Sequence, residues 1–370
     1  MEKMVSNPGS GNGVATLLIR ADASPKIGTG HIMRCLALAQ AWQRRGGTAT
    51  FMSCCESASL RRRITGERFN LVPIEKTHPD RSDLRITLEK LSALNHEQRA
   101  KTWVVLDGYH FDSSYQKNFK TADCSLLVID DMSHLSHYHA DVLLNQNIHA
   151  EKLSYSCGTS TRLLLGPRFN LLRQEFLAWK GRSRGIPDVA RKILVTLGGA
   201  DRNNVTFRIV NVLKNLQISD LEITIAIGLA NCHREMLQKE ASSAFPKIKI
   251  LQHVENMSEL MASADLAVSG GGTTCLEMAF MGLPNAVIIL AENQRSAVEE
   301  LSKEDCSINL GEQEKITSKI VTDAMEKLIY GKDLRIRMSE KGPHIIDGIG
   351  VERVLDTIMQ IDSTQSVQSP

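Results

Sequence analysis

The chain has 370 residues, of which 42% are hydrophobic, 5% aromatic and 23% charged, and 44 basic against 42 acidic side chains leave a formal charge of +2. This composition excludes an intrinsically disordered chain, a collagen and a coiled coil, and the length predicts two domains that each bury a core. The near-zero charge argues against nucleic acid and a membrane surface as partners.

The two ends of the chain and its cysteines favour a cytoplasmic protein. Residues 1–13 are polar and rich in Gly and Ser, without the apolar stretch of a secretory signal, so we expect a flexible tail there. No segment approaches the roughly 18 consecutive apolar residues that cross a bilayer. The eight cysteines are scattered, and reduced, buried thiols are the expected state.

From residue 14 onward, short apolar runs alternate with longer segments of helical periodicity, a pattern typical of βαβ units and parallel sheet. A helix is expected over 31–45, where Ile32, Leu36, Ala39 and Trp42 recur at helical spacing. The strands expected in the first half cover 14–19, 49–53, 71–74, 103–107, 125–130, 142–145 and 162–165.

A second series of strands follows a polar segment with Gly and Pro, which we interpret as a linker over 181–190. Its expected strands cover 192–197, 222–227, 247–251, 266–269, 286–290 and 307–310. The sequence therefore predicts two α/β domains, over 14–180 and 191–345. A terminal segment, 346–370, contains a helical pattern at 350–361 and could pack on either domain.

The first candidate site is the loop that joins the first strand to the first helix. Ligands of open α/β sheets bind in such loops, beyond the carboxyl ends of the strands. Gly28 and Gly30 allow tight turns there, and His31 falls at the helix start, where the helix dipole favours a neutral imidazole that can act as a base. Alternatively, His31 is an ordinary residue of a helix terminus. A dinucleotide site is less favoured because Met33 replaces the third glycine of the fingerprint.

The second candidate is a glycine turn between a strand and a helix, residues 269–284. Consecutive glycines let backbone N–H groups approach a ligand, and two threonines add hydroxyl donors at the helix start, which together suit a diphosphate. Glu277, one turn into the helix, could reach ribose hydroxyls. The turn lacks a Walker lysine, so ATP-dependent phosphoryl transfer is not implied, and close helix packing is the alternative role. The turn residues are Gly270, Gly271, Gly272, Thr273 and Thr274.

Further polar groups follow other strands. Gly198 and Gly199 could line a phosphate, and residues 291–294 could stand over the same crevice. Carboxylates end two strands of the first half, at 106–112 and 129–132, although aspartates at such places also cap helices. The histidines His134, His137 and His139 lie beside them, but their spacing matches no known helical metal site, and we expect no metal.

Several of these segments together resemble the hydrolase family of pseudaminic acid biosynthesis, which acts on UDP-2,4-diacetamido-2,4,6-trideoxy-β-L-altropyranose. The resemblance runs from about residue 17 to 360. It rests on R-A-D-A-S (20–24) with I-G-x-G-H-x-x-R (27–34), L-D-G-Y (106–109), I-D-D (129–131), L-L-N-Q-N (143–147), S-G-G-G-T-T (269–274) and A-E-N-Q (291–294). The tail before Gly13 is longer than this family needs.

The resemblance implies a fold of the glycosyltransferase-B (GT-B) type, related to the lipid II glucosaminyltransferase, with two Rossmann-like domains facing across a cleft. It implies that UDP lies on the second domain, that the terminal helix returns to the first domain, and that His31 activates water for an inverting attack at the anomeric carbon without a metal or cofactor. Asp22 is one candidate for the carboxylate that orients His31. The substrate-binding residues expected from motif and resemblance are Gly28, Gly30, Arg34, Tyr109, Gly198, Gly199, Gly270, Gly271, Gly272, Thr273, Thr274, Glu277, Asn293 and Gln294.

Two other functions remain open at this point. An inverting glycosyltransferase of the same fold could use His31 to deprotonate an acceptor hydroxyl instead of water. A protein that binds a nucleotide sugar without catalysis would share the second domain but would not depend on His31.

Overall fold

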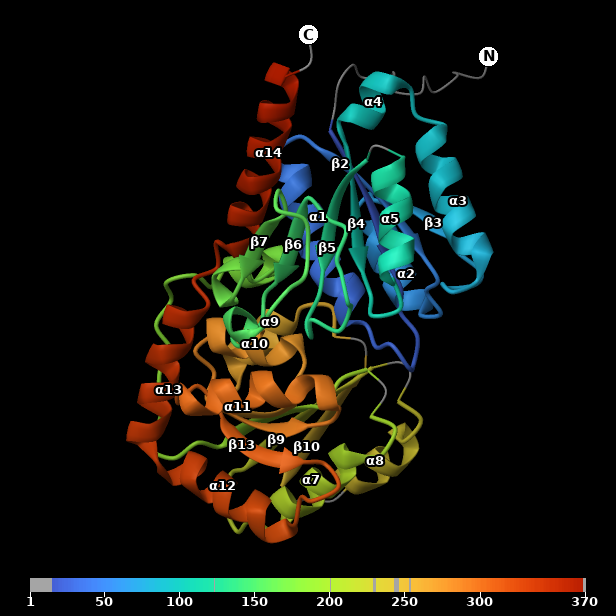
Figure 1. Cartoon of the computed structure of the whole chain (residues 1–370). Coiled ribbons are helices and arrows are strands. Elements are labelled where there is room, and N and C mark those ends of the chain that lie inside the picture. Colours follow the sequence, from blue (N-terminus) through green and yellow to red (C-terminus); the bar gives the residue numbers. More distant parts are fainter. Residues whose placement is uncertain are drawn as a thin grey trace, which may run out of the picture.

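The computed structural model describes residues 15–368, apart from 123, 200, 229–230, 243–245 and 253. The expected tail over 1–13 lies outside the described residues. Two all-parallel sheets stand one above the other in Figure 1. The first has seven strands in the order β3-β2-β1-β4-β5-β6-β7, and the second has six in the order β10-β9-β8-β11-β12-β13. Two Rossmann-like α/β domains, as the sequence predicts, are therefore confirmed.

The N-terminal domain contains the first seven strands and the helices between them. Its strands are β1 (Thr16–Ala21), β2 (Thr48–Ser53), β3 (Asn70–Pro73), β4 (Thr102–Asp107), β5 (Ser125–Ile129), β6 (Val142–Asn145) and β7 (Arg162–Leu165). Its helices are α1 (Gly30–Arg44), α2 (Ala58–Gly66), α3 (Arg81–Ser92), α4 (His96–Ala100) and α5 (Ser113–Thr121), with 3-10 turns η1 (Ala150–Lys152) and η2 (Pro167–Phe169). The short helix α6 (Gln174–Leu177) follows, and its Phe176 is buried in the core of the C-terminal domain.

Both faces of the central strands β1, β4, β5 and β6 are buried, which explains why they appear in the sequence as apolar runs. Because side chains alternate along a strand, Ile19 and Val105 face α1, whereas Leu18 and Val104 face the other side. On that other side, Tyr115 and Phe119 of α5 and Leu91 of α3 complete the core.

The C-terminal domain repeats this plan with six strands. They are β8 (Lys192–Thr196), β9 (Glu222–Ile227), β10 (Lys247–Gln252), β11 (Leu266–Gly270), β12 (Asn285–Ile289) and β13 (Ile308–Glu312). Its helices are α7 (Val205–Asn215), α8 (Arg234–Ala241), α9 (Met257–Ser263), α10 (Thr273–Phe280), α11 (Arg295–Lys303), α12 (Ser318–Tyr330) and α13 (Lys332–Ile345), with the 3-10 turn η3 (Glu292–Gln294). Helices α7 and α12 pack on one face, and α9, α10 and α11 on the other.

The last helix, α14 (Gly350–Gln368), leaves the C-terminal domain and packs on the N-terminal one (Figure 1). Val351, Val354, Leu355 and Ile358 are all buried in the same core as α1 and β1. Arg45, which directly follows α1, adds an exposed ion pair with Glu352 of α14. The chain therefore crosses between the domains twice.

The segment 181–190, interpreted from the sequence as a linker, is tied to the C-terminal domain. The Arg184 guanidinium donates to the backbone carbonyls of Met261, Ala264 and Met281. Arg335 of α13 donates in turn to the carbonyls of Pro187 and Asp188. Both arginines thereby satisfy backbone oxygens that would otherwise lack donors.

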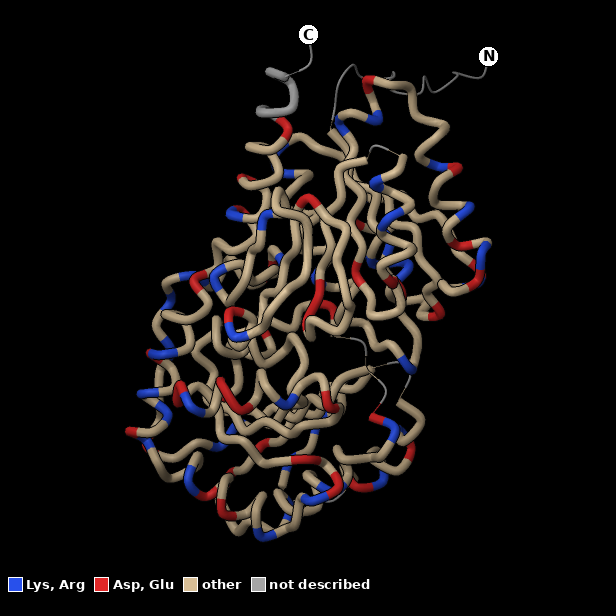
Figure 2. The backbone as a smooth tube through the Cα atoms, viewed as in Figure 1, with Lys and Arg blue, Asp and Glu red and all other residues tan. Residues whose placement is uncertain are grey.

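Each sheet has one point where the strand order reverses, between β1 and β4 and between β8 and β11. Open α/β sheets bind ligands in the crevice at this point. Lysine and arginine are interspersed with aspartate and glutamate over both domains in Figure 2. Within the described residues, no helix combines the length and apolar character needed to cross a bilayer.

Candidate active site

His31 lies at the reversal point of the first sheet, as the second residue of α1. Its side chain is buried, and its Nδ1 lies 2.6 Å from Oδ1 of Asp107. Asp107 ends β4 directly beside Ala21 at the end of β1, so strand pairing brings the two together. A carboxylate at Nδ1 stabilises the tautomer with the proton on that atom and leaves Nε2 as the basic nitrogen. Nε2 has no hydrogen-bond partner among the described residues.

Asp22, named above as one candidate to orient His31, does not contact it. Its carboxylate binds Arg20, the Nε2 atom of His110 at 2.9 Å and the backbone N–H of Cys54 at 2.7 Å. Cys54 follows β2, on the opposite side of β1 from β4. The Asp22 prediction is wrong because its side chain lies with Arg20 on the α3 and α5 face of the sheet, whereas His31 and Asp107 lie on the α1 face.

Arg34, one turn further along α1, links two buried carboxylates. Its Nε and Nη2 atoms donate to both oxygens of Asp107 at 2.7 Å, and its Nη1 donates to Asp131 at 2.7 Å. Burial opposes ionisation of Asp107, but the charges of Arg34 and His31 outweigh it and lower the pKa of this carboxyl. Burial likewise opposes ionisation of Asp131, and Arg34 again dominates and lowers the pKa. Both carboxylates are thus charged at neutral pH.

Tyr109 connects this cluster to the C-terminal domain. Its hydroxyl donates to Oδ2 of Asp131 at 2.6 Å and accepts from Nδ2 of Asn293 at 3.1 Å, in η3 of the other domain. Its ring meets the His31 imidazole edge to face, with 5.0 Å between centroids and 81° between planes. Burial first, and then Asp131, raises the pKa of Tyr109, so the hydroxyl keeps its proton.

The glycine turn of the C-terminal domain lies against the start of α1. Thr273 begins α10, and its Oγ1 would lie 3.8 Å from a Cβ placed on Gly30. A Cβ on Gly271 would come within 2.4 Å of Val298, so only glycine fits there. The first N–H groups of α10 lack partners within the helix and form a place for an anion. Gly270 ends β11, Gly272 is the N-cap of α10, and Thr274 is its second residue.

The remaining predicted glycines also lie near this junction. Gly198 has a φ of +86°, which favours glycine, and Gly199 would place a Cβ 3.9 Å from Thr29 just before α1. Gly28 has a φ of +82° and closes the turn of the first loop by donating to the carbonyl of Ser24 at 2.8 Å. Turns after β1, β8 and β11 therefore meet in one place.

Two further predicted residues, Glu277 and Gln294, also have protein partners in this structure. Oε1 of Glu277 accepts from Nη2 of Arg173 at 2.9 Å, and its Oε2 has no hydrogen-bond partner among the described residues. Burial raises the pKa of Glu277, and the charge of Arg173 opposes that shift. Oε1 of Gln294 accepts from the backbone N–H of Leu290 at 3.0 Å, which folds this side chain back on its own turn.

Sequence analysis missed Arg173 as a member of the site and recognised Asp107 and Asp131 only as carboxylates at strand ends. Asp107 and Asp131 bind Arg34 and do not cap a helix. Asp112, in contrast, caps α5 by accepting from the backbone N–H of Tyr115. The signal for Arg173 is its place two residues before Glu175, with which it also pairs. Pairing with Glu277 could not be foreseen, because 104 residues separate the two.

The histidines considered for a metal site bind separate partners. His134 contacts Asp130 and the backbone of Tyr109, whereas Nδ1 of His137 lies 3.0 Å from Oγ of Ser156. Among the described residues, no group of three or more His, Cys, Asp or Glu side chains is placed to hold a metal ion.

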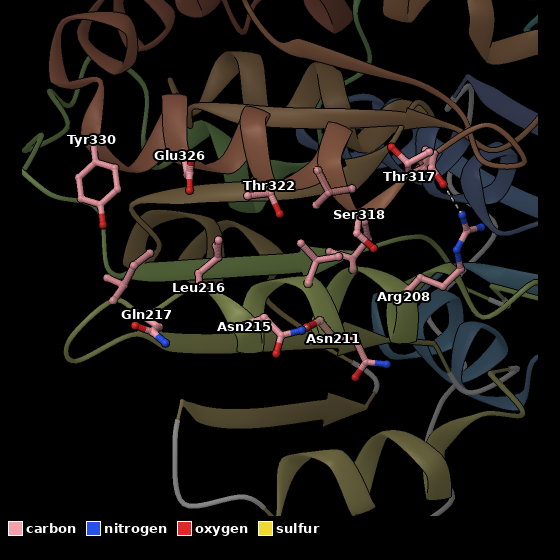
Figure 3. Close-up of a pocket in the computed structure, with 15 residues that line it drawn as sticks. Arg208, Asn211, Asn215, Leu216, Gln217, Thr317, Ser318, Thr322, Glu326 and Tyr330 are labelled. Carbon is pink, nitrogen blue, oxygen red and sulfur yellow. Dashed lines mark hydrogen bonds between the residues drawn. The ribbon is translucent and has the colours of Figure 1, made fainter.

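A separate groove of about 500 Å³ lies between α7 and α12 on the C-terminal domain (Figure 3). Arg208, Asn211 and Asn215 line one side of it, and Thr322 and Tyr330 the other. None of the residues predicted for the site takes part in this lining, so the groove is distinct from the candidate active site.

Comparison with known proteins agrees with this architecture. Residues 192–343 match the model of the glycosyltransferase family 28 C-terminal domain. The chain is 24% identical over 341 residues to the spore coat polysaccharide biosynthesis protein SpsG of Bacillus subtilis, covering 91% of this chain and 95% of that protein. It is 23% identical over 290 residues to UDP-2,4-diacetamido-2,4,6-trideoxy-beta-L-altropyranose hydrolase of Campylobacter jejuni, covering 78% and 96%. An uncharacterized protein of Methanocaldococcus jannaschii is 24% identical, and the match covers 78% of this chain and 58% of that one.

Solved structures resemble the whole chain. The crystal structure of Acinetobacter baumannii MurG has a TM-score of 0.61 at 14% identity, and the match covers 94% of this chain and 99% of that one. The S. aureus MnaA-UDP co-structure has a TM-score of 0.63 at 14% identity, with 94% and 97% covered. The chain thus has a two-domain fold of the GT-B type, and residues 192–343 match the model of the glycosyltransferase family 28 C-terminal domain.

Proposed function

We propose that this protein hydrolyses a UDP-linked 2,4-diacetamido-2,4,6-trideoxy sugar to UDP and the free sugar, with inversion at the anomeric carbon. The observation that carries the proposal is the pairing of His31 with Asp107 on one domain, directly opposite the N-terminus of α10 on the other. A base and an anion site then face each other across a single junction.

The C-terminal half would bind the nucleotide. The free N–H groups and threonine hydroxyls at the start of α10 suit a diphosphate, and the open space beside Gly272 would let a ligand approach the backbone there. Oε2 of Glu277, which Arg173 leaves open, would accept hydrogen bonds from ribose hydroxyls. Gly198 and Gly199 add a second flexible turn beside the phosphates.

The N-terminal half would supply the chemistry. Nε2 of His31 takes a proton from water as the water oxygen bonds to the anomeric carbon. The bond between that carbon and the β-phosphate oxygen breaks, and its electron pair leaves on UDP, where the helix N-terminus stabilises the charge. Asp107 stabilises the imidazolium that forms, and the proton then passes to solvent. Attack opposite the leaving group inverts the anomeric configuration.

The identity of the sugar rests on the relatives. The hydrolase of Campylobacter jejuni carries this substrate in its name, and so does a two-function protein of Helicobacter pylori that is 23% identical over 194 residues. Tyr109 and Asn293, which meet between the domains, would line the sugar pocket. NMR of the purified protein with candidate UDP-diacetamido sugars tests this assignment directly.

An inverting glycosyltransferase is the second candidate, favoured by the family model that matches residues 192–343 and by the fold shared with MurG. Incubation with the UDP-sugar and no acceptor separates the two. Stoichiometric release of UDP with a free reducing sugar supports hydrolysis, and no turnover until an acceptor is added supports transfer.

The third candidate, a protein that binds a nucleotide sugar without catalysis, is tested with a variant of His31. His31→Ala should abolish most turnover under saturating substrate while UDP still binds, because the proposed nucleotide site lies on the other domain. Turnover equal to that of the unmodified protein would remove His31 from the mechanism.

A further inference from the structure

His134, in the loop after β5, makes two contacts that a neutral imidazole cannot satisfy together. Its Nδ1 lies 3.1 Å from Oδ1 of Asp130, and its Nε2 lies 3.1 Å from the backbone oxygen of Tyr109. A carboxylate and a carbonyl both accept hydrogen bonds only. A neutral ring carries a single N–H, so one of its contacts would set two lone pairs against each other. The geometry therefore requires the doubly protonated, cationic ring.

The carboxylate that holds His134 is itself fixed. Asp130 is buried, and its Oδ2 accepts from the backbone N–H groups of Met132 at 2.9 Å and Ser133 at 2.6 Å. The hydroxyl of Tyr155 donates to the same oxygen at 3.0 Å. Burial opposes ionisation of Asp130, but these donors and His134 lower its pKa, so a rigid negative charge faces the ring.

The other groups around the ring favour its cationic form or are neutral. Asp131 adds a second negative charge from the same loop. The rings of Tyr109 and Tyr138 lie 5.9 and 6.5 Å away, centroid to centroid, and both approach edge to face. The hydrogen bond that His134 donates to Asp130 raises the pKa of His134, and burial offsets only part of that increase. The ring thus keeps its second proton to a higher pH than an ordinary histidine does.

His134 binds the backbone oxygen of Tyr109, the residue at the centre of the proposed sugar pocket. Tyr109 is fixed at its backbone oxygen by His134 and at its hydroxyl by Asp131 and Asn293, and its ring touches His31. We propose that His134, as an imidazolium, is a positioning residue that sets the place of Tyr109 relative to His31. Its effect on turnover rests on the proposed function, whereas its protonation state does not.

The proposal fixes the direction of a pH effect. When the pH rises through the pKa of His134, the ring loses a proton and releases either Asp130 or the Tyr109 carbonyl. General base catalysis requires an unprotonated base, which gives the profile an acid limb. We therefore expect kcat/KM to pass through a maximum, with a falling alkaline limb that belongs to His134.

The first arm of the test is an NMR titration of the imidazole nitrogens in the unmodified, substrate-free protein, with His134→Gln used to assign the signals. Both nitrogens of His134 should carry protons at neutral pH, and the ring should titrate above the ordinary histidine value of 6.5. A ring that carries one proton at neutral pH overturns the proposal, whether or not the protein hydrolyses a UDP-sugar.

The second arm is the pH profile of kcat/KM. The amide introduced by His134→Gln would donate one of the two hydrogen bonds at every pH, so this change should lower kcat/KM at neutral pH by about tenfold and remove the alkaline limb. His137→Gln, a matched change in the same loop whose ring lies against Ser156, should keep both limbs. An alkaline limb that persists in His134→Gln contradicts the proposal. If that variant does not fold, His134→Asn takes its place, and the NMR titration still decides.

Discussion

Replacing Asp107 with asparagine tests the orientation of the proposed base. In the native cluster, Oδ1 of Asp107 accepts from His31 and Arg34, and Oδ2 accepts from Arg34 and the Cys35 thiol. An amide has one acceptor oxygen and one NH2 group, so one of these positions must become a donor. If the NH2 group faces Nδ1 of His31, that nitrogen must accept, and the proton moves to Nε2. If it faces Nε of Arg34, two donors oppose each other in a buried place.

The expected fall in kcat follows from the loss of His31 as a general base. A tautomer with its proton on Nε2 cannot accept a proton from water, and general base catalysis contributes about 10²- to 10⁴-fold in rate. We expect kcat to fall by that factor, about 2.7–5.5 kcal/mol in barrier height. KM should change little, because Asp107 belongs to the domain opposite the proposed nucleotide site. Stability should also fall, since removing one partner of a buried ion pair costs about 3–5 kcal/mol.

Initial rates of UDP release, measured well below the melting midpoint of the variant, check the prediction. Asp112→Asn is the matched control, because asparagine caps a helix about as well as aspartate and Asp112 caps α5 a few residues further on. UDP affinity, measured by calorimetry, should survive both changes. A folded Asp107→Asn protein that keeps kcat within about threefold of the native value would refute the role of Asp107.

Three further changes probe other parts of the molecule. Glu277→Ala should raise KM more than it lowers kcat, because ribose contacts are made equally in the ground and transition states, and initial-rate kinetics would expose a pure kcat defect as contrary evidence. Gly271→Ala should cost about 1–3 kcal/mol of stability, because its Cβ would meet Val298 at 2.4 Å, and the displaced turn should bind UDP more weakly. Unchanged calorimetric affinity for UDP would argue against a ligand at this turn. Leu355→Ala should lower the free energy of unfolding in urea by about 2–5 kcal/mol, because Leu355 is fully buried in the N-terminal core. A loss below about 1 kcal/mol would mean that α14 contributes little to that core.

The strands could be predicted closely from the sequence because both faces of each sheet are buried. The expected strands 142–145 and 162–165 have the same bounds as β6 and β7. Helix α1 begins at Gly30, one residue before the expected start, because a helix terminus depends on local backbone geometry more than on apolar spacing.

The partners of the site residues could not be predicted in the same way. Asp22, Asp107 and Asp131 each follow a strand, and the sequence alone does not distinguish them. Which of them meets His31 depends on the strand order, in which β4 lies beside β1, and on the face of the sheet where each side chain lies. Asp107 lies on the α1 face and meets His31, whereas Asp22 lies on the other face with Arg20 and His110. The order of the strands along the chain does not determine which strands lie side by side, because the connection after a strand can place the next strand on either side of it.

The contact between Tyr109 and Asn293 indicates how the proposed site would distinguish one sugar from another. Without a substrate, the hydroxyl and the amide satisfy each other across the two domains. A sugar that enters between them must break this hydrogen bond and replace it. Acetamido groups carry both a donor and an acceptor and can do so, whereas an apolar substituent would leave buried polar groups unpaired at about 1–3 kcal/mol each. Selection would then depend on the hydrogen-bonding groups of the sugar more than on its size, because unpaired polar groups discriminate more strongly than small differences in apolar volume.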